Sequence, residues 1–195
     1  EAMEGSRPVD ILWVIDNSGS MDREEALVQT NMNAFAGMVG GLGIDYHVIV
    51  IADTSHISIT LTDPTRLLQV NQSVGYNDAF QQVIATYAMY QAFLRPGAVR
   101  HIIVVSDDES DMDAATFRSM LSALPAPGFP ATMAEPDGFF LHAIVAEDPP
   151  ICNGFGIPCA CTVPTCPCIA QSAARGDIYI NLQARTGGVF ASLCQ

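Results

Sequence analysis

The chain has 195 residues, of which 49% are hydrophobic and 15% are charged. This composition is typical of a globular protein with a sizeable core, and the length fits one domain better than two. The formal net charge is -13, from 21 acidic residues against 8 basic ones, all of which are arginines. Such a charge repels polyanions, so it argues against nucleic acid as a partner and leaves cations or basic molecules.

In the first half of the chain, residues 10–15 form a near-continuous apolar run, which predicts a buried strand of a parallel sheet. Residues 24–39 have apolar side chains at helical spacing, and glycines end that helix before a second buried strand at 46–52. Residues 57–61 alternate apolar and hydroxyl side chains, which predicts a half-exposed edge strand that runs antiparallel to its neighbours.

The second half repeats the alternation of strands and helices. The predicted elements are a helix at 79–93 capped by Asp78, a strand at 99–105, a helix at 114–124, a strand at 139–146, a short helix between Asp177 and Gly187, and a strand at 189–193. The sequence therefore predicts an α/β fold with a doubly wound, mostly parallel sheet, one antiparallel edge strand and helices on both faces. We expect a single domain over residues 1–195, with a Cys-rich insertion at 152–168.

All six cysteines lie in the last quarter of the chain: Cys152, Cys159, Cys161, Cys166, Cys168 and Cys194. An even number in a Pro- and Gly-rich stretch favours disulfides, and with them an extracellular, cell-surface or periplasmic location. A zinc site is the alternative, although structural zinc sites usually contain Cys-x2-Cys pairs and the close pairs here are Cys-x-Cys. Cys152 follows the fourth buried strand and Cys194 ends the final strand, so we expect these two to pair.

No stretch approaches the about 20 apolar residues that span a bilayer, so direct membrane insertion is not expected. Any signal or lipid anchor is expected to have been removed or to lie outside this sequence.

The loop after the first strand offers one carboxylate and two hydroxyls at alternating positions, from Asp16, Ser18 and Ser20. These oxygens can converge on one point as the chain turns, and Mg²⁺, Mn²⁺ and Ca²⁺ prefer oxygen ligands. The alternative is a plain strand-to-helix turn that is capped by Ser and Asp.

A hydrophobic strand that runs into Asp-x-Ser-Gly-Ser-Met resembles the metal-ion-dependent adhesion site of von Willebrand factor A domains. The similarity extends to Ser106-Asp107 after the strand HIIVV, to the order of the elements, and to Thr186-Gly187-Gly188 before the last strand. It implies a Rossmann-like fold in which Asp16, Ser18, Ser20 and Asp107 hold the ion.

The family also supplies a Thr ligand from a later loop, and here the matching position falls near Asn77 or Asp78. Asp78 is the favoured candidate for the fifth ligand, and a carboxylate there would favour Ca²⁺. A plain helix N-cap is the alternative role for Asp78.

The resemblance implies a divalent-cation-dependent adhesion or protein-binding module, in which a carboxylate of a protein partner completes the coordination of Mg²⁺, Ca²⁺ or Mn²⁺. It does not imply an enzyme. A structural surface or assembly subunit with a purely structural ion is one alternative. A metal-dependent hydrolase is another, although no obvious His or Lys stands ready for proton transfer. The sequence leaves the oligomeric state open.

Three other patterns are weaker signals. The run from Asp107 to Asp113 contains five carboxylates, which either form a second cation site or a solvated loop in which Asp111 or Asp113 caps the next helix. An acidic loop of this kind is similar to those of bacterial secreted or lipid-anchored members of the family. Arg175-Gly176-Asp177 matches a tripeptide that integrins bind, but it falls at a helix start. The four histidines are scattered and have no metal-ligand spacing.

Overall fold

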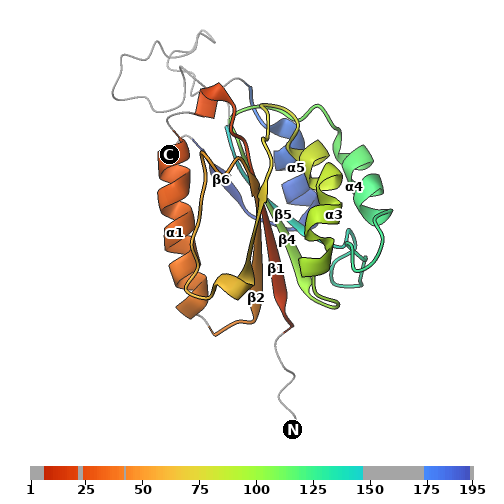
Figure 1. The fold of residues 1–195 in the computed structure, drawn as a ribbon. Coiled ribbons are helices and arrows are strands. Elements are labelled where there is room, and N and C mark those ends of the chain that lie inside the picture. Colours follow the sequence, from red (N-terminus) through yellow and green to blue (C-terminus); the bar gives the residue numbers. More distant parts are fainter. Residues whose placement is uncertain (1–6, 22–23, 42, 147–173, 194–195) are drawn as a thin grey trace.

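The computed structural model describes residues 7–21, 24–41, 43–146 and 174–193. These residues form a sheet with α1 on one face and the remaining α-helices on the other (Figure 1). In this part of the chain no helix is long and apolar enough to cross a membrane.

The sheet has six strands in the order β3-β2-β1-β4-β5-β6. They are β1 Val9–Ile15, β2 Tyr46–Ala52, β3 Leu67–Asn71, β4 Val99–Ser106, β5 Phe140–Val145 and β6 Phe190–Ser192. Every neighbouring pair is parallel. The chain moves outward from β1 to β3 and then returns to β4 on the other side of β1, so the topology switches between β1 and β4. In an open parallel sheet, this switch point is where ligands bind.

The prediction of an antiparallel edge strand at 57–61 is wrong. The edge strand is β3, which follows a 3-10 turn at Pro64–Arg66 and runs parallel to β2. Residues 57–61 form no strand, because side chains bind their backbone amides: Ser58 N donates to Gln29 Oε1 (2.7 Å) and Ile59 N to Gln69 Oε1 (3.0 Å). The alternation did identify a buried side, since the three apolar residues of this segment, Ile57, Ile59 and Leu61, are all buried.

Five α-helices connect the strands: α1 Glu25–Gly41, α2 Ala79–Ala85, α3 Tyr87–Tyr90, α4 Ala114–Ser122 and α5 Asp177–Thr186. Short 3-10 turns lie at Gly19–Met21 and Gln91–Phe93. The single helix predicted over 79–93 is therefore divided at Thr86. Two side-chain hydroxyls donate hydrogen bonds to backbone carbonyls of α2 there. Thr86 Oγ1 donates to Gln82 O (2.7 Å), and the buried Tyr90 hydroxyl donates to Val83 O (2.8 Å). Such side-chain bonds to the backbone bend helices.

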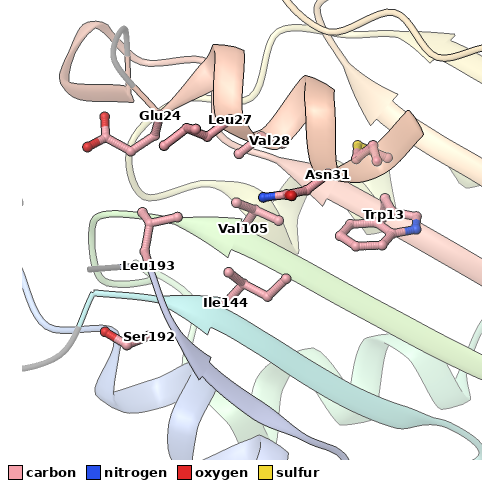
Figure 2. A pocket seen from close by; sticks show the side chains of 10 residues that line it. Trp13, Glu24, Leu27, Val28, Asn31, Val105, Ile144, Ser192 and Leu193 are labelled. Carbon is pink, nitrogen blue, oxygen red and sulfur yellow. The ribbon is translucent and has the colours of Figure 1, made fainter. Parts of the chain in front are cut away.

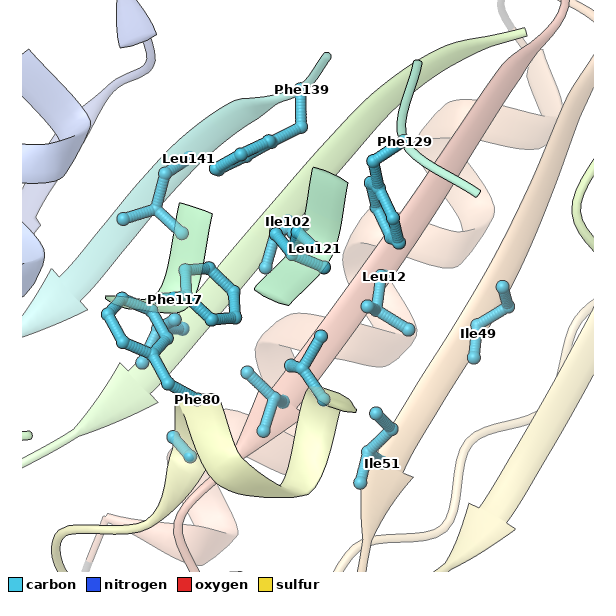
Figure 3. Close-up of a cluster of buried hydrophobic side chains, with 14 of the residues drawn as sticks. Leu12, Ile49, Ile51, Phe80, Ile102, Phe117, Leu121, Phe129, Phe139 and Leu141 are labelled. Atoms are coloured by element: carbon cyan, nitrogen blue, oxygen red, sulfur yellow. The ribbon is translucent and has the colours of Figure 1, made fainter. Parts of the chain in front are cut away.

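The core has two parts, one on each face of the sheet. On the face of α2, α4 and α5, the rings of Phe80 and Phe117 stack with centroids 3.8 Å apart, over Leu141 of β5 and its neighbours (Figure 3). Gly188 lets the chain pass close to β5 after α5, because a Cβ at this position would overlap the carbonyl of Leu141. This part of the core extends across β1 and β4 and the strands on either side of them. It therefore holds the carboxyl ends of β1 and β4 next to each other.

The opposite face is covered unevenly. Strands β1 and β2 are buried at almost every residue, with α1 and the 57–61 segment packed over them. In β5, by contrast, buried and half-buried residues alternate, with a burial pattern that repeats every second residue. Because successive side chains of a strand point to opposite faces, the described residues cover β5 on one face and leave it partly open on the other.

Candidate cation site

The loops that follow β1 and β4 meet at the carboxyl edge of the sheet. The amide of Asp16 donates to Val105 O (2.9 Å), so β1 and β4 stay paired up to the point where the two loops begin. Asn17 holds the first loop against the other side, since its amide donates to Val74 O (2.9 Å) and its Oδ1 accepts from Asp53 N (2.8 Å). Asn17 was not among the predicted site residues, although a side chain with both donor and acceptor at a strand end is typical of such an anchor.

Four of the five predicted ligands are brought together here. Ser20 Oγ donates to Asp107 Oδ1 (3.0 Å), and the hydroxyls of Ser18 and Ser20 are 3.1 Å apart. Asp16 Oδ1 accepts from Ser18 N (2.8 Å). Asp16 Oδ2 accepts from the buried hydroxyl of Ser106 (2.8 Å), which joins the two loops a second time. The result is a small group of carboxylate and hydroxyl oxygens at the switch point.

The two carboxylates of this group are buried. Asp16 is 0% exposed and Asp107 is 3% exposed. Burial raises the pKa of Asp107 to about 6, and the nearby charge of Asp16 adds to that rise while the hydrogen bond from Ser20 opposes it. Burial also raises the pKa of Asp16, against the bonds from Ser18 and Ser106. Both shifts mean that this site disfavours its own negative charge, which a bound cation would stabilise.

The oxygen spacing fits a small divalent ion. In an octahedral shell with Mg–O distances of about 2.1 Å, adjacent ligand oxygens are about 3.0 Å apart. The separations of Ser18 Oγ from Ser20 Oγ and of Ser20 Oγ from Asp107 Oδ1 are 3.1 and 3.0 Å. The oxygens of Ser18, Ser20 and Asp107 therefore have the spacing of adjacent ligands of one ion, and Asp16 is joined to them by the bond from Ser18 N. Among the described residues no three His, Cys, Asp or Glu side chains are grouped for metal binding, so the hydroxyls are an essential part of this donor set.

Asp78, the fifth predicted ligand, is not bonded to the other four. Its Oδ1 accepts from Gly75 N (2.7 Å) and its Oδ2 from Gln82 Nε2 (2.7 Å), which keeps the carboxylate within its own loop and helix. Asp78 does occupy the N-cap position of α2, as predicted, but its side chain makes no capping bond to the helix backbone. The role of Asp78 as an ion ligand stays a prediction.

Two of the five carboxylates in the acidic run after β4 accept from backbone amides at helix starts. Asp113 accepts from Ala115 N and Thr116 N (both 2.9 Å), so its predicted role as the cap of α4 is confirmed. Glu109 accepts from Ser110 N and, at 3.1 Å, from Ile178 N in the first turn of α5. This contact was not predicted, because the sequence does not show which distant helix begins beside the loop.

The weaker sequence patterns are also placed. Arg175 and Asp177 form an ion pair (3.1 Å) at the start of α5, where Gly176 rather than Asp177 is the N-cap residue. Gly187 ends α5, as predicted, and its backbone is in the left-handed conformation. The cysteines, with the expected pairing of Cys152 and Cys194, lie outside the described residues.

Two of the scattered histidines do meet. His101 Nδ1 and His142 Nε2 are 2.8 Å apart on the partly open face of β4 and β5, and His142 Nδ1 accepts from Val189 N (3.0 Å). Burial lowers the pKa of both rings, that of His142 to about 4, so the pair is neutral at pH 7.

Comparisons with models of known protein families, with curated proteins and with solved structures found no match. The class of the protein therefore rests on its own fold and site: a doubly wound α/β protein with a group of carboxylate and hydroxyl oxygens at its switch point.

Proposed function

We propose that the protein is a divalent-cation-dependent binding module. In this proposal Asp16, Ser18, Ser20 and Asp107 hold the ion, and a carboxylate of a protein partner completes its coordination. The observation that carries the proposal is the bond from Ser20 Oγ to Asp107 Oδ1 (3.0 Å), which joins the oxygens of two separate strand ends into one donor set.

Two further features support it. The site lies at the switch point of a parallel sheet, where open α/β folds bind their ligands. Its carboxylates have raised pKa values, and a bound divalent ion would lower these values because it stabilises the ionised form. The resemblance of the first loop to the metal-ion-dependent adhesion site of von Willebrand factor A domains points to the same function, and implies adhesion outside the cell rather than catalysis.

The ion is tested first. Metal-stripped protein is titrated with Mg²⁺, Mn²⁺ and Ca²⁺ by calorimetry, beside Asp16→Asn and Asp107→Asn. The expected result is one site in the wild type and at least about a tenfold loss of affinity in each variant, because each removes a charged ligand. Asp113→Asn is the matched control, since Asp113 belongs to the same acidic run but caps α4. No binding by the wild type, or equal loss in the control, would contradict the proposal.

The partner's chemistry is tested second. Acidic and amidated forms of the same peptide library are passed over the immobilised protein with Mg²⁺ and then with a chelator. Retention of carboxylate peptides that ends with the chelator is expected. Retention that persists in the chelator would refute a carboxylate bound through the ion.

A further inference from the structure

One half of a sheet face lacks a covering layer among the described residues. On the side of α1, five side chains of β4 and β5 are half-buried: His101, Ile103, Phe140, His142 and Ile144. The central strands of parallel sheets are normally covered on both faces. The strands β1 and β2, which α1 covers, follow that rule, whereas β4 and β5 do not.

A cavity of about 160 Å³ runs between this open half and α1 (Figure 2). Its walls are mostly apolar, with Leu27 on α1 facing Leu193 after β6, and with Val105 and Ile144 between them. Leu27 is 64% exposed, and Met38, three turns further along the same side of α1, is 66% exposed. This side of α1 thus presents two exposed apolar side chains toward the groove, with the polar Asn31 one turn after Leu27.

The open surface has the dimensions of one helix. Neighbouring strands are about 4.8 Å apart, so the span from β4 to β6 is about 10 Å, which is the diameter of an α-helix with its side chains. The six residues of β5 extend about 20 Å, the length of a helix of about 14 residues. A helix lying beside α1 would complete the layer.

The charge of the groove indicates what that helix carries. Glu24, at the end of the cavity nearest the start of α1, has its Oε2 buried without a hydrogen-bond partner among the residues that the structure describes. A buried carboxylate oxygen without a donor is unfavourable, and a Lys or Arg reaching it would satisfy it. We infer that the groove between α1 and the β4–β6 half of the sheet binds an amphipathic helix of a partner protein, with its apolar side on the sheet and a basic residue at Glu24.

The test uses a synthetic amphipathic helical peptide of about 14 residues, with leucines along one side and a lysine at one end of that side. Trp13 is the single tryptophan of the chain and lines the cavity, so its fluorescence reports occupancy. A saturable change in Trp13 emission is expected, with affinity at least about tenfold lower after Leu27→Asp. The measurement is made in a chelator, which keeps it independent of the proposed cation site.

The matched control is Met89→Asp, because Met89 on α3 is 57% exposed and lies on the opposite side of the sheet. That variant should bind as the wild type does, and Glu24→Gln should weaken binding of the lysine peptide but not of its norleucine analogue. Equal binding of a peptide with the same composition in scrambled order would overturn the inference. So would a dimer of the protein alone, in sedimentation, that Leu27→Asp dissociates, because the groove would then belong to a second copy of this chain.

Discussion

Strand β1 has a buried aspartate at each end, and the two are stabilised in different ways. Asp10, at the amino end, is 1% exposed and is surrounded by arginines. Its Oδ1 accepts from Arg95 Nε (2.8 Å), its Oδ2 from Arg95 N (2.8 Å), and the guanidinium of the buried Arg100 also donates to it. Asp16, at the carboxyl end, is bonded by a hydroxyl and an amide, and the nearest strand end adds a second buried carboxylate, Asp107.

The difference separates a carboxylate that is paired with cations of the fold from two carboxylates that are placed at the proposed cation site. At the amino edge the chain supplies its own cations, the guanidinium groups of Arg95 and Arg100, so the carboxylate of Asp10 is paired within the fold. At the carboxyl edge the pKa values of Asp16 and Asp107 are raised, which means that ionisation destabilises the folded state. A bound cation would offset the unfavourable free energy of ionising these two carboxylates, so raised pKa values are expected at an edge that binds a cation. They are not expected at an edge whose charges only stabilise the fold.

The largest expected effect comes from removing the charge at the amino edge. Asp10→Asn leaves the guanidinium of Arg100, which is nearly fully buried, without its counter-ion. Breaking a buried pair in this way costs about 3–5 kcal/mol of the free energy of unfolding. Urea denaturation with and without Mg²⁺ measures the loss, which should be the same in both. A loss below about 1 kcal/mol would show that the pair is not what stabilises this edge.

At the carboxyl edge, replacing an Asp by Asn should raise the free energy of unfolding rather than lower it. Asp107→Asn is expected to stabilise the metal-free protein at pH 7, by up to about 3 kcal/mol, because the pKa of Asp107 is about 6 when folded against 3.8 in the unfolded chain. The benefit of the raised pKa is fully present below pH 3.8 and is lost as the pH rises through 6. The gain of the variant over the wild type should therefore grow between pH 4 and 6 and then level off. A gain that does not depend on pH would contradict this account.

Cation binding should stabilise the folded state by neutralising the carboxylates at the carboxyl edge. If the site binds Mg²⁺, a concentration one hundred times the Kd stabilises the folded state by about 2.7 kcal/mol. Thermal unfolding of the wild type in a Mg²⁺ series measures this shift. Asp10→Asn should retain it, while Asp107→Asn, with its affinity lowered at least about tenfold, should lose about half of it or more. An equal shift in both variants would mean that the ion acts elsewhere.

The smallest expected effect is at a hydroxyl. Ser20→Ala removes the donor to Asp107 Oδ1, which should raise the pKa of Asp107 further and cost about 1 kcal/mol at pH 7. At pH 4 Asp107 is already protonated when folded, and the cost should be smaller. Chemical shifts of the Asp107 side chain against pH would measure the new pKa directly, and an unchanged value would argue against this bond.

The strands and the first loop were predictable because their signals are local. Apolar runs and the oxygen-rich loop at residues 16–20 stand next to each other in the sequence, and parallel pairing then brings Asp107 beside them. The hydrogen bonds of Asp78 were not predictable, since they depend on the turn at Gly75 and on the side chain of Gln82. A helix position alone does not show where a carboxylate is directed.

Other features depended on contacts between distant parts of the chain. The alternation at 57–61 marks one buried side, but whether such a segment joins a sheet depends on what binds its amides, here the side chains of Gln29 and Gln69. The meeting of His101 and His142 required the register of β4 with β5. The partly open face of β4 and β5 among the described residues was also not predictable. An apolar run predicts a buried strand but does not show whether one or both faces of that strand are covered.

Gly188 has a practical consequence for experiments that sample substitutions at random. Because a side chain there would collide with the backbone of β5, nearly every replacement should reduce the yield of folded protein. A survey scored by partner binding alone would then rank this glycine with the proposed cation ligands, although it lies after α5. If abundance and binding are scored separately, substitutions of Gly188 should lower the abundance of folded protein. Substitutions of Asp107 should lower binding while abundance is kept.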